Sequence, residues 1–353
     1  MENEKLLEGK HVVVTGGTGS LGRAVVRRLL SGDAGVPDRV TVFSRDEAKQ
    51  HFMRLEFLEA PKATDEIIYS SAKESLRFVI GDVRDADSVA KVISDAHVVI
   101  NAAALKQVPS SEYFPMEAVK TNINGAENIV KACLKNGTRI EKVIGISTDK
   151  ACKPVNVMGM TKAIQERLFI EANRQADVSF NCVRYGNVIA SRGSIIPLFI
   201  DRINAGKSIT ITLETMTRFL LPLERAVDTV LQSLRTDERG VTLVPKIPAA
   251  RIVDVARALM GEKTVGVEFT GIRPGEKIHE IMISEEEAPR TEDTGDYFAI
   301  HPVLPELRRS GRVGGIQGEY SSKDDNIGVE AIRSLLSSAD SEIEEFLSEG
   351  RQR

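Results

Sequence analysis

Short apolar runs alternate with segments of helical periodicity along the first half of the chain. Between the first two runs, Val25, Val26, Leu29 and Leu30 recur at the spacing of a buried helix face. The runs predict six buried strands, at residues 11–15, 39–44, 76–82, 97–101, 142–147 and 179–184. Strands that alternate with helices predict a parallel sheet with helices on both faces, and therefore a doubly wound α/β fold of Rossmann type.

This regular alternation ends after Gly186. Beyond it, short strand-like runs such as SITIT and GVTLVP mix with helical stretches such as residues 252–260. We therefore predict two domains: a dinucleotide-binding domain over residues 1–186, to which some later segments return, and a smaller substrate domain over residues 187–353. An acidic helix at residues 329–346 is expected to form a peripheral cap.

The composition excludes several function classes. Of the 353 residues, 42% are hydrophobic and 28% charged, which is typical of a soluble protein with a sizeable core. The net charge of −4 leaves no basic excess for binding nucleic acid. Three cysteines without a Cys-x-x-Cys pair and five scattered histidines predict neither a disulfide framework nor a metal site. The charged start and the lack of an apolar run of about 18 residues lead us to expect a cytoplasmic protein that does not bind membranes.

A glycine-rich turn, GGTGSLG at residues 16–22, follows the first predicted strand and opens the first predicted helix. Its small residues let the backbone approach a pyrophosphate, whose charge the free amides and the helix dipole stabilise. The place of this turn after the first strand of an alternating α/β pattern predicts a dinucleotide site. The predicted cofactor contacts in the turn are Gly16, Thr18, Gly19, Ser20, Leu21 and Gly22.

The end of the second predicted strand indicates which dinucleotide binds. An acidic residue there would bind the ribose 2′-hydroxyl of NAD, whereas an arginine suits the additional phosphate of NADP. Ser44 and Arg45 occupy this position, so NADP is favoured over NAD unless Arg45 is only a solvated loop charge. The residues expected to contact adenine and ribose after the third and fourth strands are Asp82, Val83, Ala102, Ala103 and Ala104.

GGTGSLG together with NAAA at residues 101–104 resembles the extended short-chain dehydrogenase/reductase superfamily. Its members carry Ser or Thr after the fifth strand and Tyr-x-x-x-Lys on the next helix. The Tyr-x-x-x-Lys pattern of this chain, Tyr69 to Lys73, precedes the third predicted strand, and we interpret it as a chance match. At the expected position Lys162 is retained, but Met158 stands one helical turn before it in place of the tyrosine.

Methionine cannot accept a proton, so another group must do so when a substrate hydroxyl is oxidised. Thr148, Asp149 and Lys150 follow the fifth predicted strand and supply a hydroxyl, a carboxylate and an amine. A neighbouring carboxylate and amine can divide acid and base roles, because each charge shifts the pKa of the other. Two alternatives stay open: a surface ion pair at Asp149 and Lys150, or an inactive protein that only binds a nucleotide.

Further motifs narrow the resemblance. They are NAAALKQVPSSEYFP, STDKACKPVN, MGMTK, RYGNVIASRGSIIPLF, MTRFLLPLE and GIRPGEKIHE, in this order over residues 10–302. Together they resemble the UDP-N-acetylglucosamine 4,6-dehydratases of bacterial surface-glycan synthesis, some of which also have methionine at the position of Met158. MGMTK and ASRGSIIPLF are most similar to the inverting members, so inversion at carbon 5 is favoured. Family members assemble as dimers or hexamers, so the resemblance implies a homo-oligomer.

The resemblance also implies a mechanism with internally recycled NADP. The cofactor takes a hydride from carbon 4 of the sugar, water is lost across carbons 5 and 6, and the hydride returns to carbon 6. By resemblance, Thr148 hydrogen-bonds the carbon 4 hydroxyl and Lys162 holds the nicotinamide ribose. Asp149 would be the acid for the leaving hydroxyl and Lys150 the base at carbon 5, although the division between these two stays open.

The C-terminal half must then hold most of a sugar nucleotide. Arginine suits the diphosphate because its guanidinium offers a planar fork of donors. The candidate substrate contacts are Lys106, Asn187, Arg192, Ser194, Thr217, Arg218, Arg273 and Glu276. By resemblance, Arg273 contacts the diphosphate and Glu276 the ribose. The alternatives are a salt bridge from Arg218 to Glu224, an ordinary turn at RPGEK, and a cofactor contact for Lys106.

Two other functions remain open. A retaining dehydratase, a 4-epimerase or a reductase would use the same fold on this or another nucleotide sugar. An epimerase needs no base at carbon 5, so the cluster of Thr148, Asp149 and Lys150 argues against it. A non-catalytic nucleotide-binding interaction protein would suit Met158, and it predicts cofactor binding without a product.

Overall fold

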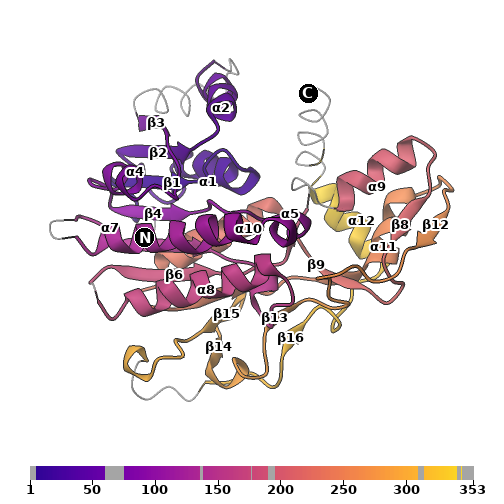
Figure 1. Cartoon of the computed structure of the whole chain (residues 1–353). Coiled ribbons are helices and arrows are strands. Elements are labelled where there is room, and N and C mark those ends of the chain that lie inside the picture. Colours follow the sequence, from indigo (N-terminus) through magenta and orange to yellow (C-terminus); the bar gives the residue numbers. More distant parts are fainter. Residues whose placement is uncertain are drawn as a thin grey trace.

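The computed structural model describes residues 5–59, 75–135, 138–175, 177–189, 195–308, 314–339 and 343. Its centre is a nine-stranded sheet in the order β14-β15-β10-β6-β5-β4-β1-β2-β3 (Figure 1). The strands from β10 to β3 run parallel, whereas β15 is antiparallel to both β10 and β14. The bounds are β1 (His11–Thr15), β2 (Arg39–Ser44), β3 (Leu76–Ile80), β4 (Val98–Asn101), β5 (Lys142–Ile146), β6 (Ser179–Val183), β10 (Thr242–Pro245), β14 (Thr291–Asp293) and β15 (Tyr297–Ile300).

The six strands predicted for the first half of the chain are all present, with ends that shift by at most two residues. Each is a nearly continuous apolar run because helices cover both faces of the sheet, and β1 buries all five of its residues. The predicted α/β fold of Rossmann type is therefore confirmed.

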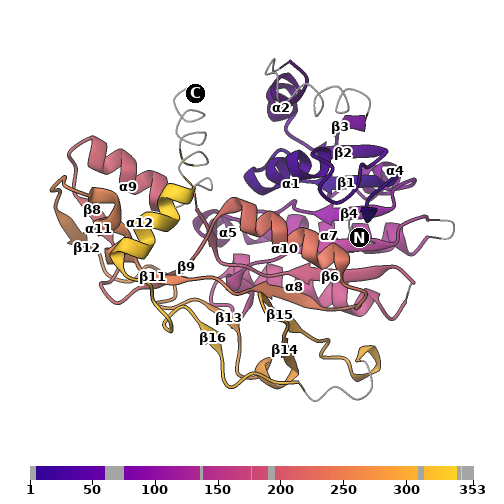
Figure 2. The ribbon, with the colours of Figure 1, turned by 180° about the vertical axis from the view of Figure 1, so that it is seen from behind.

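Helices cover the two faces of this sheet in separate groups (Figures 1 and 2). α1 (Ser20–Leu30) and α10 (Leu223–Arg235) pack against each other on one face. α4 (Ala86–Val92), α7 (Gly125–Cys133) and α8 (Val157–Ala172) cover the other face, so an apolar core lies on each side of the sheet. The other helical elements of this body are α2 (Glu47–Glu59), α5 (Val108–Tyr113), α6 (Pro115–Ala118), the π-helical η2 (Val119–Asn124) and the single 3-10 turn η3 (Asp149–Ala151).

A smaller lobe lies to one side of the sheet and has two apolar cores of its own (Figure 1). Its small sheets have the orders β11-β9-β7 and β12-β8. The elements of this lobe are β7 (Asn187–Val188), α9 (Ile195–Asn204), β8 (Ile209–Ile211), β9 (Thr217–Leu221), β11 (Ala249–Arg251), α11 (Ile252–Met260), β12 (Val267–Phe269) and α12 (Val329–Ser338). The remaining elements are β13 (Ile281–Ile283), which pairs with β16 (Tyr320–Ser321), and the 3-10 turns η4 (Ala288–Arg290) and η5 (Pro305–Leu307).

The chain passes between the two bodies more than once. α10, β10, β14 and β15 follow residue 186 in the sequence and pack in or on the large sheet. The predicted division at residue 186 stays a prediction. α12 spans Val329–Ser338 and packs on α11 through Ile332 and Leu336. Of the helix predicted to residue 346, residues 340–342 and 344–346 lie outside the described residues. Within the described ranges, no helix combines the length and apolar character that crossing a bilayer requires.

A buried ion network joins the edge of β6 to the segment that carries β13. Arg184 is 3% exposed, and its guanidinium lies 2.6 Å from Glu166 of α8 and 2.7 Å from Glu287. It also donates to the carbonyl of Met282 at 2.7 Å. Burial would raise the pKa of Glu287, but Arg184 lowers it to about 2, so the network is charged at neutral pH.

We expect Arg184→Met to destabilise the fold strongly, because the substitution removes the cation between two buried carboxylates and leaves Glu287 with only Arg290, at 3.3 Å, among its described cation partners. The expected loss in the free energy of unfolding is about 3–5 kcal/mol, measured by urea denaturation. Arg174→Ala is the matched control, since Arg174 pairs with Glu306 at 2.9 Å where both are about half exposed. Its expected loss is about 0–1 kcal/mol, and equal losses in the two variants would contradict the prediction.

Candidate active site

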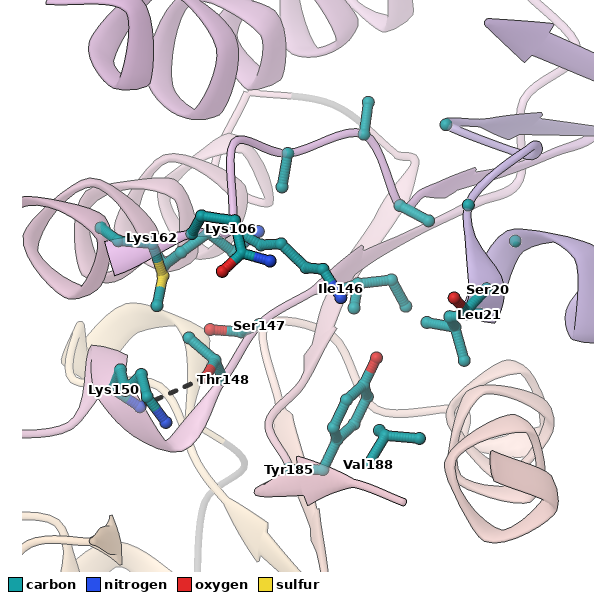
Figure 3. A pocket seen from close by; sticks show the side chains of 18 of the residues that line it. Ser20, Leu21, Lys106, Ile146, Ser147, Thr148, Lys150, Lys162, Tyr185 and Val188 are labelled. Carbon is teal, nitrogen blue, oxygen red and sulfur yellow. Dashed lines mark hydrogen bonds between the residues drawn. The ribbon is translucent and has the colours of Figure 1, made fainter. Parts of the chain in front are cut away.

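A cavity of about 630 Å³ opens at the carboxyl ends of the parallel strands. Loops after β1, β2, β4, β5 and β6 line it, as expected for a ligand site in a doubly wound sheet. Figure 3 shows Thr148 and Lys150 on one side of the cavity and Ser20 and Leu21 on the other, with Tyr185 and Val188 along a third.

The glycine-rich turn brings its backbone against the loop after β4. Gly16 has a φ of +64°, and a Cβ there would lie 2.7 Å from the Cα of Ala103. A Cβ on Gly22 would lie 2.6 Å from the Gly16 carbonyl, so only glycine allows this close approach at either position. The six positions predicted in this turn all line the cavity: Gly16, Thr18, Gly19, Ser20, Leu21 and Gly22. A turn this tight fits the pyrophosphate of a dinucleotide.

Four residues at the end of β2 also line the cavity: Ser44, Arg45, Asp46 and Lys49. The Ser44 hydroxyl lies 2.8 Å from that of Thr18, which joins this strand end to the glycine-rich turn. Arg45 is 60% exposed, and Lys49 forms an ion pair with Asp46. Sequence reasoning missed Lys49, although its place just after Arg45 at the start of a helix was a usable signal.

The residues predicted for adenine and ribose divide into two groups. Ala102, Ala103 and Ala104 line the cavity, whereas Asp82 and Val83 do not. The Asp82 carboxylate accepts hydrogen bonds from Arg84 at 2.7 and 2.9 Å, and Val83 is buried. An adenine contact at these two residues stays a prediction.

Thr148, Asp149 and Lys150 line the cavity where η3 follows β5. Asp149 Oδ1 accepts a hydrogen bond from the Thr148 hydroxyl at 2.8 Å and another from Lys150 Nζ at 3.1 Å. The Asp149 side chain is 1% exposed, and its Oδ2 is buried without a hydrogen-bond partner. The alternative of a surface ion pair is therefore wrong for this pair, because Asp149 lies inside the protein.

The surroundings favour the protonated form of both groups. Burial is the largest effect and raises the pKa of Asp149; Lys150 opposes it, and the carboxylate of Glu280 adds a smaller raising effect, so that the pKa is raised overall. Burial would lower the pKa of Lys150, but Asp149 and Glu280 outweigh it and raise that pKa. Asp149 can therefore hold a proton at pH values at which an ordinary carboxyl group is ionised.

Helix α8 places Met158 and Lys162 beside this turn. Both are buried and line the cavity, and the helix starts with a hydrogen bond from the amide of Gly159 to the side chain of Asn156. Lys162 Nζ donates to Gln165 Oε1 at 2.6 Å. Burial lowers the pKa of Lys162 to about 8.

The structure brings only part of the predicted substrate set to the cavity. Lys106 and Asn187 line it, while Arg192 and Ser194 lie outside the described residues. Thr217, Arg218, Arg273 and Glu276 do not line it, so substrate contacts there stay predictions. Tyr69 to Lys73, the chance match, also lies outside the described residues.

Arg218 and Thr217 are held by the segment of β13. The Thr217 hydroxyl lies 2.8 Å from His279 Nδ1, and Arg218 donates to the carbonyl of Ile278 at 3.1 Å. Glu224, which the sequence offered as a possible salt-bridge partner of Arg218, forms an ion pair with Arg28.

The RPGEK turn lies against the start of α8. Gly275 has a φ of +78°, and its carbonyl accepts a hydrogen bond from Asn156 Nδ2 at 2.8 Å. Lys277 Nζ donates to the carbonyl of Cys152 at 2.5 Å, and Glu276 accepts from Thr212 at 3.1 Å. These contacts make the turn part of the support of α8 and of η3.

Sequence reasoning assigned no role to several other residues at the cavity. Ser147 lines it, and its hydroxyl donates to Glu166 Oε1 at 2.5 Å, which links the cavity to the buried Arg184 network. The further lining residues are Gln107, Val108, Pro109, Ile146, Tyr185, Gly186, Val188 and Leu223. Within the described part of the chain, no group of three His, Cys, Asp or Glu side chains is placed to hold a metal ion.

The parallel sheet and the glycine-lined cavity at the carboxyl ends of its strands define a protein of the Rossmann dinucleotide-binding class. A model of the family described as polysaccharide biosynthesis protein matches residues 12–302. The chain therefore belongs to the polysaccharide biosynthesis protein family, which confirms the resemblance drawn from the motifs.

Individual relatives carry two activity names. A protein of Campylobacter jejuni named UDP-N-acetylglucosamine 4,6-dehydratase (inverting) is 42% identical over 299 residues, 84% of each chain. A protein of Rickettsia canadensis named UDP-glucose 4-epimerase is 45% identical over 299 residues, 82% of each chain. Pen from Bacillus thuringiensis has a similar crystal structure, with a TM-score of 0.82, 31% identity, and coverage of 95% of this chain and 98% of Pen.

More distant structures share the fold. The dTDP-glucose 4,6-dehydratase DesIV of Streptomyces venezuelae, solved with bound NAD, has a TM-score of 0.64 and 20% identity over 76% of this chain and 86% of DesIV.

The lowered pKa of Lys162 predicts a pH-dependent cost to the fold. Between pH 8 and 10.5 the unfolded chain keeps the proton of Lys162 and the folded chain loses it, so the free energy of unfolding rises with pH in this range. Below pH 8 the folded chain must bury a charged lysine, which lowers its stability. Lys162→Met should therefore gain in unfolding free energy relative to the natural protein at pH 7. That gain should shrink by on the order of 1–2 kcal/mol at pH 9.5.

Urea denaturation at the two pH values tests this. Lys131→Met is the matched control, because Lys131 is an exposed helical lysine. A difference between Lys162→Met and the natural protein that is the same at both pH values would contradict the prediction.

Proposed function

We propose that this chain is an NADP-dependent UDP-N-acetylglucosamine 4,6-dehydratase that inverts carbon 5 and serves surface-glycan synthesis. The observation that carries the proposal is the contact between the buried Asp149 and the partly exposed Lys150 at the cavity, next to the Thr148 hydroxyl. Elimination of water from a sugar needs an acid for the leaving hydroxyl and a base for the proton on carbon 5. The pair supplies two proton-transferring groups in addition to the hydroxyl of Thr148.

The binding of a dinucleotide is supported by the tight turn at Gly16 and Gly22. When bound, the nicotinamide would supply reversible hydride transfer, from carbon 4 at the start and to carbon 6 at the end. By resemblance to the family, Lys162, which lines the cavity, would hold the nicotinamide ribose. The cations Arg45 and Lys49 at the end of β2 support NADP, because they offer positive charge to a 2′-phosphate.

The proton steps fall to this chain's own residues. Thr148 would hydrogen-bond the carbon 4 hydroxyl, whose proton would pass to neutral Lys150 and from there to solvent as the hydride leaves carbon 4. Met158 takes no part in proton transfer. Asp149 suits the acid, because its raised pKa keeps a proton available for the leaving hydroxyl. Lys150 would be the base at carbon 5, and it must first lose a proton because its neighbours favour the ammonium form.

A 4-epimerase is the second candidate, since relatives at 45% identity carry that name. Epimerisation moves a hydride and a proton at carbon 4 alone. A second buried proton-transferring group beside the first would then have no chemical use, which favours the dehydratase.

The deciding experiment is mass spectrometry of UDP-N-acetylglucosamine after incubation with the purified protein in heavy water, without added cofactor. We expect the loss of one water and the gain of one deuterium at carbon 5, because the base exchanges its proton with solvent. Lys150→Met should slow this reaction by roughly 10²–10⁴-fold, and Lys131→Met should not.

The other outcomes are distinct. An unchanged mass requires NMR of the sugar: a carbon 4 epimer would establish an epimerase, whereas the unreacted sugar with bound NADP would support the non-catalytic alternative. NMR of the dehydrated product then distinguishes inversion from retention at carbon 5.

Arg45→Ala tests the cofactor. If Arg45 binds the 2′-phosphate, the substitution should weaken the binding of NADP by about tenfold or more and leave that of NAD nearly unchanged. Calorimetric titration of both cofactors measures the ratio. If neither cofactor binds more weakly, Arg45 is a solvated loop charge; equal weakening of both would place Arg45 at a part that the two cofactors share, and either result contradicts the prediction.

A further inference from the structure

Glu280 lies behind the Asp149–Lys150 pair and is not among the residues that line the cavity. Its side chain is 2% exposed, and Oε1 lies 3.2 Å from Lys150 Nζ and 3.7 Å from Arg218 Nε. Two hydrogen bonds with Ser322, at 2.9 Å and 2.8 Å, fix the backbone of Glu280. Glu280 is therefore a rigidly held carboxylate in contact with a proposed catalytic group.

Lys150 thus contacts two buried carboxylates at once. Its Nζ lies 3.1 Å from Asp149 Oδ1 and 3.2 Å from Glu280 Oε1. Each carboxylate has a second oxygen that is buried without a hydrogen-bond partner. The cations Arg218 and Lys277 lie on the Glu280 side of the group. These cations balance the negative charge of an ionised Glu280. A negative charge on Asp149 would instead have to share the ammonium group of Lys150 with Glu280.

We propose that Glu280 is a positioning residue that holds the Lys150 ammonium and, by its fixed negative charge, keeps the transferable proton on Asp149. This inference rests on the proposed function, in which Asp149 is the acid and Lys150 the base.

The directions of the pKa values agree with this geometry. Burial would raise the pKa of Glu280, but Lys150 and Arg218 outweigh it and lower that pKa, so Glu280 stays ionised. Glu280 in turn raises the pKa values of both Asp149 and Lys150. A negative neighbour favours a neutral carboxyl group and a charged amine, and both effects must therefore disappear together when the charge is removed.

The proposed role of Glu280 adds no proton or electron transfer to the elimination of water. The proton of the Asp149 carboxyl group goes to the carbon 6 oxygen as the C6–O bond breaks, and the electron pair of that bond leaves with water. The carbon 5 proton goes to neutral Lys150, while the C5–H electron pair forms the C5–C6 double bond. Glu280 neither gains nor loses a proton.

The test is the pH dependence of kcat at saturating UDP-N-acetylglucosamine. In Glu280→Gln the pKa values of Asp149 and Lys150 both fall, so both limbs of the profile should move to lower pH by about one unit or more. KM should stay roughly unchanged, because Glu280 does not line the cavity. Glu280→Asp, which keeps the charge, should restore much of the natural profile.

Two further variants separate charge from packing. Arg218→Gln removes a positive charge from the far side of Glu280, so both limbs should move to higher pH, opposite to Glu280→Gln. Glu287→Gln removes a buried carboxylate that pairs with Arg184 rather than with Lys150, and it should lower stability without moving the limbs. Unmoved limbs in Glu280→Gln, or the same direction of movement in Arg218→Gln, would overturn the proposal.

A turnover-free readout distinguishes this inference from the proposed function. Carbon-13 NMR of labelled aspartate side chains, with Asp149→Asn to identify the signal, follows the titration of Asp149 in the free protein. A lower midpoint in Glu280→Gln supports the role of Glu280 even if no nucleotide sugar is dehydrated. An unchanged midpoint overturns it even if the natural protein is a dehydratase.

Discussion

The site depends on the close contact between the start of α8 and the turn η3. A Cβ on Gly159 would lie 2.1 Å from the Lys150 carbonyl, so no other residue allows the helix to pack there. This contact places Met158 and Lys162 beside Thr148, Asp149 and Lys150, although they belong to different elements. The cap by Asn156, whose side chain also reaches the carbonyl of Gly275, fixes the helix end from the other side.

The segment around β13 completes a site that the Rossmann body begins. It supplies two buried carboxylates, Glu280 and Glu287, and each one neutralises a cation that follows a strand of the large sheet, Lys150 after β5 and Arg184 after β6. Isolated buried charges of this kind are unfavourable, so the segment and the sheet edge stabilise each other only when docked. The docking of this segment against the large sheet therefore also sets the charge state of the proposed catalytic pair.

The sequence allowed the sheet and the glycine-rich turn to be predicted, because apolar runs and backbone turns are local signals. The turn at residues 16–22 and the triplet at 148–150 were found in this way, and all of their predicted site residues line the cavity. Glu280 was not found, since its partner Lys150 is 130 positions earlier in the chain and charge pairs leave no periodic pattern. Arg218 was assigned to substrate for its charge alone, and its contacts with Ile278 and Glu280 arise only from tertiary packing.

Because Met158 cannot transfer a proton, the proposed proton transfers are assigned to residues of η3. A tyrosine at this position would place a phenol near Lys162, whose cation would lower the phenol's pKa. With methionine there, Lys162 donates its hydrogen bond to Gln165, and burial leaves its own pKa at about 8. Lys162 is then the titratable group that α8 brings to the cavity, and its amine is engaged with Gln165. Asp149 and Lys150 are the titratable groups next to the Thr148 hydroxyl, which is why the proton transfers are assigned to this turn rather than to α8.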